Sequence, residues 1–404
     1  MYRTRLLSKT FLDALEQFPA VMVTGPRQTG KTTFLLHERS KDCAYASFDD
    51  PLERSFAISD PNGFLDRFEA GPVILDEVQY VPEILPYLKM RIDRDRTRNG
   101  KWILTGSQQF HLMSGIIESL AGRVALLELL PFSIPESGTR EGGLSVATLD
   151  GGYPEIVFHP EKRDLWLRSY VQTYIERDVR SLRNITDIRS FELFLSLLAS
   201  RHAQELNGSE LARDVGHSLP TITSWIGVLE ASYLIFMLPP YFRNYGKRLI
   251  KSPKLYFIDP ALACYLTRQT NGEAALSGPM GGPLFEGLIV SEAVKMFASR
   301  GLRPDLFFWR SNDGLEVDLI LRIGTVLYPV EIKLTATPTV KHVEPMERFC
   351  DLARKSGEEC RPGLLVCRAS EERVLPGGHR SIPWQEFSSR LWGLLSGDRS
   401  PPPP

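Results

Sequence analysis

Short apolar, β-branched runs alternate with helix-forming stretches over the first third of the chain. The strand-like runs lie at residues 21–24, 44–48, 73–76, 102–105 and 124–128. Alternation of this kind is typical of a parallel sheet covered by helices. We therefore predict an α/β domain with a parallel sheet core over residues 1–137.

The pattern changes after a glycine-rich break at residues 138–152. Residues 164–200 contain almost no Gly or Pro and place apolar residues at helical spacing, which predicts a helical region over 150–200. Residues 205–241 then have the pattern of a helix, a tight turn at Gly216, a second helix from Pro220 and a pair of strands. That order predicts a winged helix-turn-helix over 201–252.

The last part of the chain mixes helix and strand again. We predict helices at 283–298 and 340–355 and strands at 315–323, 327–334 and 364–368. These elements favour a separate α/β domain over residues 253–397. The proline-rich end, residues 398–404, is predicted to be disordered.

Composition sets limits on function. A formal net charge of -1 over 404 residues argues against a chain-wide surface for polyanions, so any nucleic-acid contact must be local. Five cysteines without a CxxC pair indicate neither a zinc knuckle nor a disulfide framework. No signal-peptide core and no apolar run long enough to cross a bilayer is present, so we expect a cytoplasmic protein without membrane contacts.

Residues 25–32 match the phosphate-binding pattern GxxxxGK(S/T), and they lie between an apolar strand and a helix-forming run. Gly25 and Gly30 allow the backbone to curl so that its N–H groups face phosphate oxygens. Lys31 is expected to contact the β- and γ-phosphates of ATP, and the Thr32 hydroxyl to ligate Mg²⁺. The predicted nucleotide-binding residues are Gly25, Pro26, Arg27, Gln28, Thr29, Gly30, Lys31, Thr32, Thr33 and Asp76.

The strand at 73–76 ends in two acids, at the sheet edge where open α/β sheets bind ligands. Asp76 is expected to hold Mg²⁺, and Glu77 to orient and polarise the attacking water. Ser107 and Gln108 follow the strand at 102–105, and either can position the water if that strand neighbours the strand before the loop. The alternative is that both are ordinary turn residues.

Arg123 precedes the fifth strand and is a candidate to reach the γ-phosphate of a neighbouring subunit. The alternative is a surface salt bridge, and Arg177 and Arg180 are rival candidates. An arginine that acts across a subunit boundary implies a homo-oligomer, with a hexameric ring as one form.

Several further blocks accompany these motifs. The blocks lie at residues 75–79, 104–107, 120–123, 151–155, 174–178, 252–257 and 316–318. With them, nearly the whole chain resembles a prokaryotic group of AAA+ ATPases that carry a C-terminal domain of unknown function. The resemblance implies an oligomeric, nucleotide-dependent ATPase without a defined physiological substrate. Many AAA+ proteins have Asn where this chain has Ser107, a departure that bears on how the water is positioned.

Asp318 and the pair Glu331 and Lys333 lie on two predicted strands joined by a turn at Gly324, which resembles the PD-(D/E)XK nuclease fold. Glu331 and Lys333 point to the same face of a strand, and Glu286 on the preceding helix completes the set. Such carboxylates can hold Mg²⁺ while a lysine organises a water for attack on a phosphodiester. The alternative is a binding scaffold that does not cleave.

Residues 241–251 interleave cations and aromatics, a pattern suited to phosphate contact and base stacking on DNA or RNA. The predicted recognition helix begins at 220–225 with hydroxyl groups but no basic residue, and packing between subunits is its alternative role. We expect a magnesium-dependent AAA+ ATPase that acts on nucleic acid. An ATP-gated nuclease and a nucleotide switch that recruits a protein partner are the alternatives.

Overall fold

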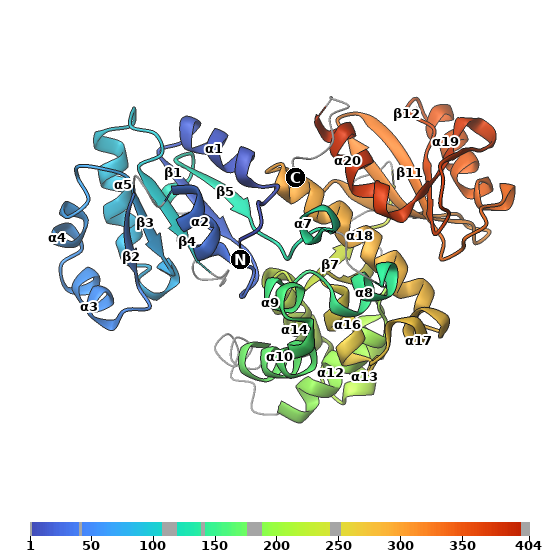
Figure 1. The fold of residues 1–404 in the computed structure, drawn as a ribbon, viewed down its shortest axis with the longest axis horizontal. Helices are drawn as coiled ribbons and strands as arrows, with labels where there is room; N and C mark the ends of the chain where they lie inside the picture. Colours follow the sequence, from blue (N-terminus) through green and yellow to red (C-terminus); the bar gives the residue numbers. More distant parts are fainter. Residues whose placement is uncertain are drawn as a thin grey trace.

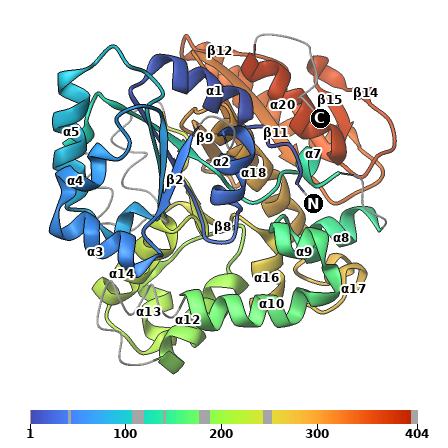
Figure 2. The same cartoon turned by 60° about the vertical axis from the view of Figure 1, so that its left-hand side comes forward.

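The computed structural model describes residues 2–39, 43–106, 119–138, 142–175, 188–242 and 252–396. Figure 1 shows an N-terminal sheet domain in blue, a largely helical middle part in green, and a C-terminal sheet domain in orange and red. Helix α18, Gly281–Ser299, contacts elements of all three parts. This helix therefore lies at the centre of the molecule, which Figure 2 shows from a second direction.

The N-terminal domain is built on a parallel five-stranded sheet. Its strands have the order β2-β3-β4-β1-β5. The strands are β1 Ala20–Thr24, β2 Ala44–Ser47, β3 Val73–Asp76, β4 Trp102–Thr105 and β5 Val124–Glu128. The covering helices are α1 Ser8–Gln17, α2 Lys31–Arg39, α3 Pro51–Ser59, α4 Pro61–Asp66 and α5 Ile84–Arg94, with the short turn η1 Val78–Tyr80. The predicted sheet is confirmed, and each strand lies within about a residue of its predicted bounds.

The three central strands β1, β3 and β4 are buried on both faces, because their side chains alternate between two hydrophobic clusters. Val21 and Val23 of β1 pack on one side with Phe34 of α2. Ala20 and Met22 pack on the other side, in the cluster that also contains residues of α4 and α5. The continuous apolar runs in the sequence follow from this two-sided burial.

The middle part shares one hydrophobic cluster that extends from Tyr153 to Leu284. It begins after α7 Ile134–Ser137. Its helices are α8 Gly143–Asp150, α9 Pro154–Phe158, α10 Arg163–Tyr170, α12 Ile188–Ser200, α13 Gly208–Val215, α14 Leu219–Ala231, α16 Pro260–Leu266 and α17 Gly272–Ser277. A short 3-10 helix, η2 Pro160–Lys162, and a π-helix, η3 Val171–Ile175, flank α10. Helices α9, α10 and α12 bury their apolar faces in the same cluster as α13, α14 and α16. The helical region predicted over residues 150–200 therefore does not form a core of its own.

A small antiparallel sheet accompanies α13 and α14. Its strands are β6 Gln204–Glu205, β7 Ile235–Leu238 and β8 Lys254–Phe257, in the order β6-β8-β7. The predicted tight turn is present, with Gly216 at φ 78°. The boundary predicted at residues 252 and 253 needs correction, because β8 pairs with β7 and β6 and so belongs to the preceding segment. A charged stretch, and not a short turn, separates the two paired strands, so the sequence did not reveal their pairing.

The C-terminal domain contains a seven-stranded sheet with the order β14-β15-β13-β11-β10-β9, and β12 beside β11. Its strands are β9 Leu306–Arg310, β10 Glu316–Ile323, β11 Val326–Ile332, β12 Glu359–Cys360, β13 Leu364–Cys367, β14 Arg373–Val374 and β15 Arg380–Pro383. The helices are α18, α19 Glu344–Lys355 and α20 Phe387–Ser396, with turns η4 Val340–His342, η5 Pro376–Gly378 and η6 Trp384–Glu386. The predicted helices and strands lie close to these bounds, whereas β9 and β15 were not predicted.

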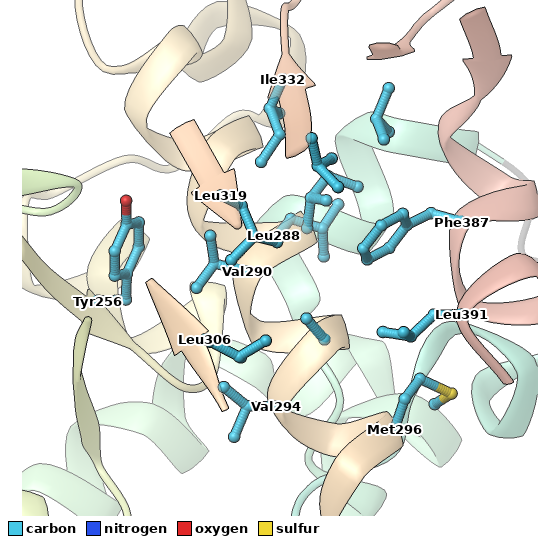
Figure 3. Close-up of a cluster of buried hydrophobic side chains, with 14 of the residues drawn as sticks. Tyr256, Leu288, Val290, Val294, Met296, Leu306, Leu319, Ile332, Phe387 and Leu391 are labelled. Atoms are coloured by element: carbon cyan, nitrogen blue, oxygen red, sulfur yellow. The ribbon is translucent and has the colours of Figure 1, made fainter. Parts of the chain in front are cut away.

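Helix α18 supplies much of the C-terminal core. Figure 3 shows its Leu288, Val294 and Met296 beside side chains from the sheet and from α20. Nearly the whole surface of α18 is buried. A helix that is buried on all sides must be surrounded by other elements, which agrees with its contacts to all three parts.

Cys350 in α19 and Cys360 in β12 form a disulfide, with Cα atoms 5.4 Å apart. The sequence had indicated no disulfide framework. The pairing depends on α19 packing against β12, a contact that cysteine spacing alone does not reveal. In the described residues, no helix is both long enough and apolar enough to span a membrane.

Candidate functional site

The loop between β1 and α2 curls around the ammonium group of Lys31. Three residues of the loop have positive φ angles, namely Gly25 at 141°, Gln28 at 63° and Gly30 at 84°. Lys31 Nζ donates to the carbonyl oxygens of Gly25, at 3.1 Å, and of Pro26, at 2.8 Å. The curled backbone is the shape that a phosphate-binding loop requires.

Burial lowers the pKa of the Lys31 ammonium to about 8, while the carboxylates of Glu77 and Asp76 act in the opposite direction. The side chain is 7% exposed. A buried cation beside a helix N-terminus is most stable with an anion nearby. The loop is therefore electrostatically suited to a phosphate group.

Gly25 has a second role that its sequence pattern did not reveal. A Cβ atom at this position would lie 2.4 Å from the carbonyl oxygen of Leu129, which follows β5. Leu129 N–H also donates to the Thr24 carbonyl, at 2.8 Å. The loop thus lies directly against the backbone that leaves the sheet at β5.

Asp76 ends β3 beside the loop. Its Oδ2 accepts hydrogen bonds from Thr32 Oγ1, at 2.9 Å, and from the Tyr45 hydroxyl, at 2.8 Å. Its Oδ1 is buried, and no described residue donates to it. The two predicted magnesium ligands therefore lie in contact, with one carboxylate oxygen left over.

The oxygen atoms of Thr32 and Asp76 fit a magnesium ion. Mg²⁺ usually takes only one or two protein carboxylates, and phosphates and waters complete its coordination. No group of three His, Cys, Asp or Glu residues that could hold a metal occurs in the described parts of the chain. A site that shares Mg²⁺ with a nucleotide does not need such a group.

Glu77 follows Asp76 with φ 58°, in the left-handed region that residues other than glycine rarely adopt. Its carboxylate accepts a hydrogen bond from the side-chain amide of Gln79. Backbone strain of this kind costs about 1–3 kcal/mol and occurs often at functional sites. The strained backbone and the amide together fix where the Glu77 carboxylate lies.

The remaining predicted loop residues surround this centre. Thr29 is buried, Arg27 is half-buried, and Gln28 and Thr33 are exposed. Strand β4 pairs with β1, as the prediction for Ser107 required, but Ser107 and Gln108 lie outside the described residues.

Arg123 lies at the opposite edge of the sheet from the loop, because it precedes β5, which runs parallel to β1. Its guanidinium donates to both carboxylate oxygens of Asp93, at 2.7 and 3.0 Å. These bonds lower the pKa of Asp93 to about 2. Within this chain Arg123 takes the alternative role, a surface ion pair. Its action on a neighbouring subunit stays a prediction, and the rivals Arg177 and Arg180 lie outside the described residues.

The four residues of the predicted nuclease-like set occur in one charged cluster beside the neighbouring strands β10 and β11 of the C-terminal sheet. Lys333 Nζ lies 2.9 Å from Asp318 Oδ2 and 2.6 Å from Glu331 Oε1. Glu286 Oε1 accepts from Lys254 Nζ, at 2.9 Å, and from the hydroxyl of Tyr256, at 2.6 Å. Lys254 also pairs with Glu316.

Every carboxylate of this cluster is thus held by a lysine. Burial, together with the charge of Asp318, raises the pKa of Glu286 to about 7 and that of Glu331 to about 8. The described residues do not present three carboxylate, His or Cys side chains arranged to hold a metal. Metal-dependent cleavage at this cluster therefore stays a prediction.

Three side-chain contacts at the nucleotide site and at the charged cluster were not predicted from the sequence. Tyr45 reaches Asp76 from β2, and Lys254 and Tyr256 reach Glu286 from β8. Lys254 and Tyr256 lie in the block at 252–257 that carried part of the family resemblance. That block was the only available signal, because the contacts join residues that are distant in sequence.

The segment that follows β5, residues 128–136, connects the loop to the rest of the molecule. Glu128 Oε1 accepts from the hydroxyl of Tyr233, which follows α14, at 2.9 Å. Phe132 N–H donates to the Gly152 carbonyl at 2.7 Å, and the Phe132 carbonyl accepts from Lys295 Nζ at 3.1 Å. We call residues 128–136 the connecting segment.

Family comparisons agree with this site. Residues 17–137 match an AAA domain family, residues 143–273 a domain of unknown function (DUF8612), and residues 281–387 a second domain of unknown function (DUF4143). The fold of the sheet, the curled loop and the first match together define an AAA-type P-loop ATPase.

The chain is also 30% identical, over 334 residues, to the uncharacterized proteins Rv2008c of Mycobacterium tuberculosis and Mb2031c of Mycobacterium bovis. The match covers 81% of this chain and 73% of each relative. The chain therefore belongs to the same protein family as these two mycobacterial proteins.

Solved structures with partial similarity include the Walker-type ATPase PABY2304 of Pyrococcus abyssi, at 17% identity and a TM-score of 0.42. That match covers 64% of this chain and 94% of the other. A variant of RuvB from Thermotoga maritima matches at 17% identity and a TM-score of 0.32, over 61% of this chain and 94% of the other.

Proposed function

We propose that this protein is a magnesium-dependent ATPase of the AAA+ class, in which ATP binding and hydrolysis drive conformational change. The observation that carries the proposal is the contact between Thr32 and Asp76 beside the curled loop, with Asp76 Oδ1 left without a donor from the described residues. Lys31 binds the β- and γ-phosphates, and Thr32 and Asp76 hold the metal. When bound, Mg²⁺ neutralises charge on the phosphates.

Glu77 orients and polarises the attacking water in this proposal. Gln79 holds the Glu77 carboxylate by a hydrogen bond, and the strained backbone restricts its position further. Placement and charge account for most of the catalysis of phosphoryl transfer. A fixed carboxylate beside the metal ligands supports this role.

Phosphate release tests the proposal directly. Purified protein is expected to release phosphate from ATP with Mg²⁺ present, at a rate on the order of 1–10 s⁻¹, the lower end of the usual range for enzymes. Addition of EDTA is expected to stop the release, and excess Mg²⁺ to restore it. Hydrolysis that continues unchanged in EDTA would rule out the magnesium-dependent mechanism.

We propose that the active form is a homo-oligomer, with a hexameric ring as one form. In such an assembly an arginine of one subunit completes the nucleotide site of the next. Arg123 supports this only if its exposed pair with Asp93 opens, which is inexpensive for a surface ion pair. Arg177 and Arg180 remain rival candidates.

We further propose nucleic acid as the target. The order of helix α12, β6, α13, α14, β7 and β8, with sheet order β6-β8-β7, supports a winged helix-turn-helix. Thr221 and Thr223 lie in the first turns of α14, and Thr223 is exposed. The cations of residues 243–251, which are outside the described residues, supply the phosphate contacts in this proposal.

Salt-dependent binding tests this target. We expect the protein to bind DNA or RNA at about 50 mM salt and to lose affinity steeply as salt rises to about 200 mM, because phosphate contacts release counterions. Fluorescence anisotropy with a labelled oligonucleotide measures this. The double variant Lys247→Ala/Arg248→Ala is expected to bind more weakly and with a shallower salt dependence. The control Lys341→Ala/Lys355→Ala removes two exposed charges elsewhere. Absence of binding at low salt would instead favour a nucleotide switch that recruits a protein partner.

A further inference from the structure

Arg5, in the segment before α1, contacts the phosphate loop through the backbone carbonyl of Thr29. Its Nη1 donates to the carbonyl oxygen of Thr29 at 3.0 Å, and its Nη2 to that of Leu130 at 2.6 Å. Its Nε pairs with Glu136 at 2.9 Å, and the guanidinium lies over the Phe132 ring. The side chain is 5% exposed. A buried arginine thus joins the loop to the connecting segment.

The bond to Thr29 determines how one peptide group of the loop is oriented. In a planar trans peptide, the carbonyl of Thr29 and the N–H of Gly30 point to opposite sides. Because Arg5 holds the carbonyl on the outer side, the Gly30 N–H faces the inner side of the curl. Gly30 has φ 84°, and a peptide beside glycine can rotate at little cost. Without an anchor, the carbonyl is free to turn inward, where its partial negative charge would repel phosphate.

We propose that Arg5 is a positioning residue for the nucleotide site, which fixes the peptide between Thr29 and Gly30 so that its N–H group faces the phosphates. The inference rests on the proposed ATP-binding function. It assigns to the segment before α1 a part in nucleotide affinity, although that segment lies outside the phosphate-binding motif. Glu136 keeps Arg5 in place, and is itself held by the backbone N–H groups of Leu6 and Ser133.

The test compares KM and kcat for ATP hydrolysis in the full chain. Arg5→Met and Arg5→Lys are both expected to raise KM about tenfold, the size of one lost hydrogen bond to a charged group, with kcat within about threefold of wild type. A lysine can pair with Glu136, but its single ammonium cannot also reach both carbonyls. Arg5→Lys therefore isolates the loop contact even if Arg5→Met folds poorly.

A control variant separates this role from other effects of changing the same segment. Arg3→Ala removes contacts from the same segment to the carbonyls of Glu136 and Ser137 and none to the loop. Its KM is expected to be unchanged. Equal KM values for Arg5→Lys and wild type would overturn the positioning role, whereas a wild type that binds no nucleotide would overturn the proposed function as well.

Discussion

Replacement of Lys31 by alanine is expected to abolish measurable binding of magnesium nucleotide. The ammonium lies inside the loop and, in the proposed function, contacts two phosphates. Each hydrogen bond between charged groups contributes about 1.5–3 kcal/mol, so loss of two lowers affinity about a hundredfold or more. The variant also removes a buried cation from the neighbourhood of Asp76 and Glu77.

Isothermal titration calorimetry with Mg-ADP measures this effect. Lys9→Ala is the matched control, because Lys9 is an exposed lysine on α1. The control is expected to bind as wild type does. Similar binding heats and affinities for Lys31→Ala and wild type would contradict the assignment of the loop as the phosphate site.

Glu77→Gln is expected to bind nucleotide and to lose turnover. The amide has almost the same shape as the carboxylate and keeps a side-chain oxygen that can accept from Gln79, but it cannot polarise water as a base. Loss of a group in this role typically lowers the rate about 10²–10⁴-fold. Binding is expected to stay within about threefold of wild type, because Lys31, Thr32 and Asp76 are untouched.

Steady-state phosphate release and a binding titration on the same protein separate the two effects. Glu83→Gln, an exposed glutamate before α5, is the matched control and is expected to hydrolyse ATP normally. If Glu77→Gln hydrolyses ATP as fast as wild type, Glu77 has no catalytic role and another group must activate the water.

The N-terminal sheet was predictable because its signals are local. Each of its strands is a short run that ends at a turn or a motif, and burial of the central strands on both faces removes any need for polar alternation there. Lys31, Thr32 and Asp76 could be grouped in advance because parallel strands present their carboxyl ends at one edge. The structure places Thr32 in contact with Asp76 as that rule requires.

Other features depend on contacts that sequence spacing does not encode. Arg5 meets Thr29, Tyr45 meets Asp76, and Tyr233 meets Glu128 only after separate elements have packed together. Strand β8 was assigned to the wrong segment because a charged stretch separates it from β7. The charged cluster around Asp318 was predicted in part, but Lys254 comes from β8, and its presence changes which groups the carboxylates contact.

The joint between the connecting segment and α18 limits how the molecule can bend. Glu292 is fully buried there, and it accepts from the Ile134 N–H and the Ser388 hydroxyl while it pairs with Lys295. Pulling α18 away would break the hydrogen bonds of Glu292 to Ile134 and Ser388 and that of Lys295 to Phe132, and each buried group left without its partner costs about 1–3 kcal/mol. Any rotation of the domains during a catalytic cycle must therefore occur at another point of the chain. We expect β5 and α18 to move together as one rigid unit.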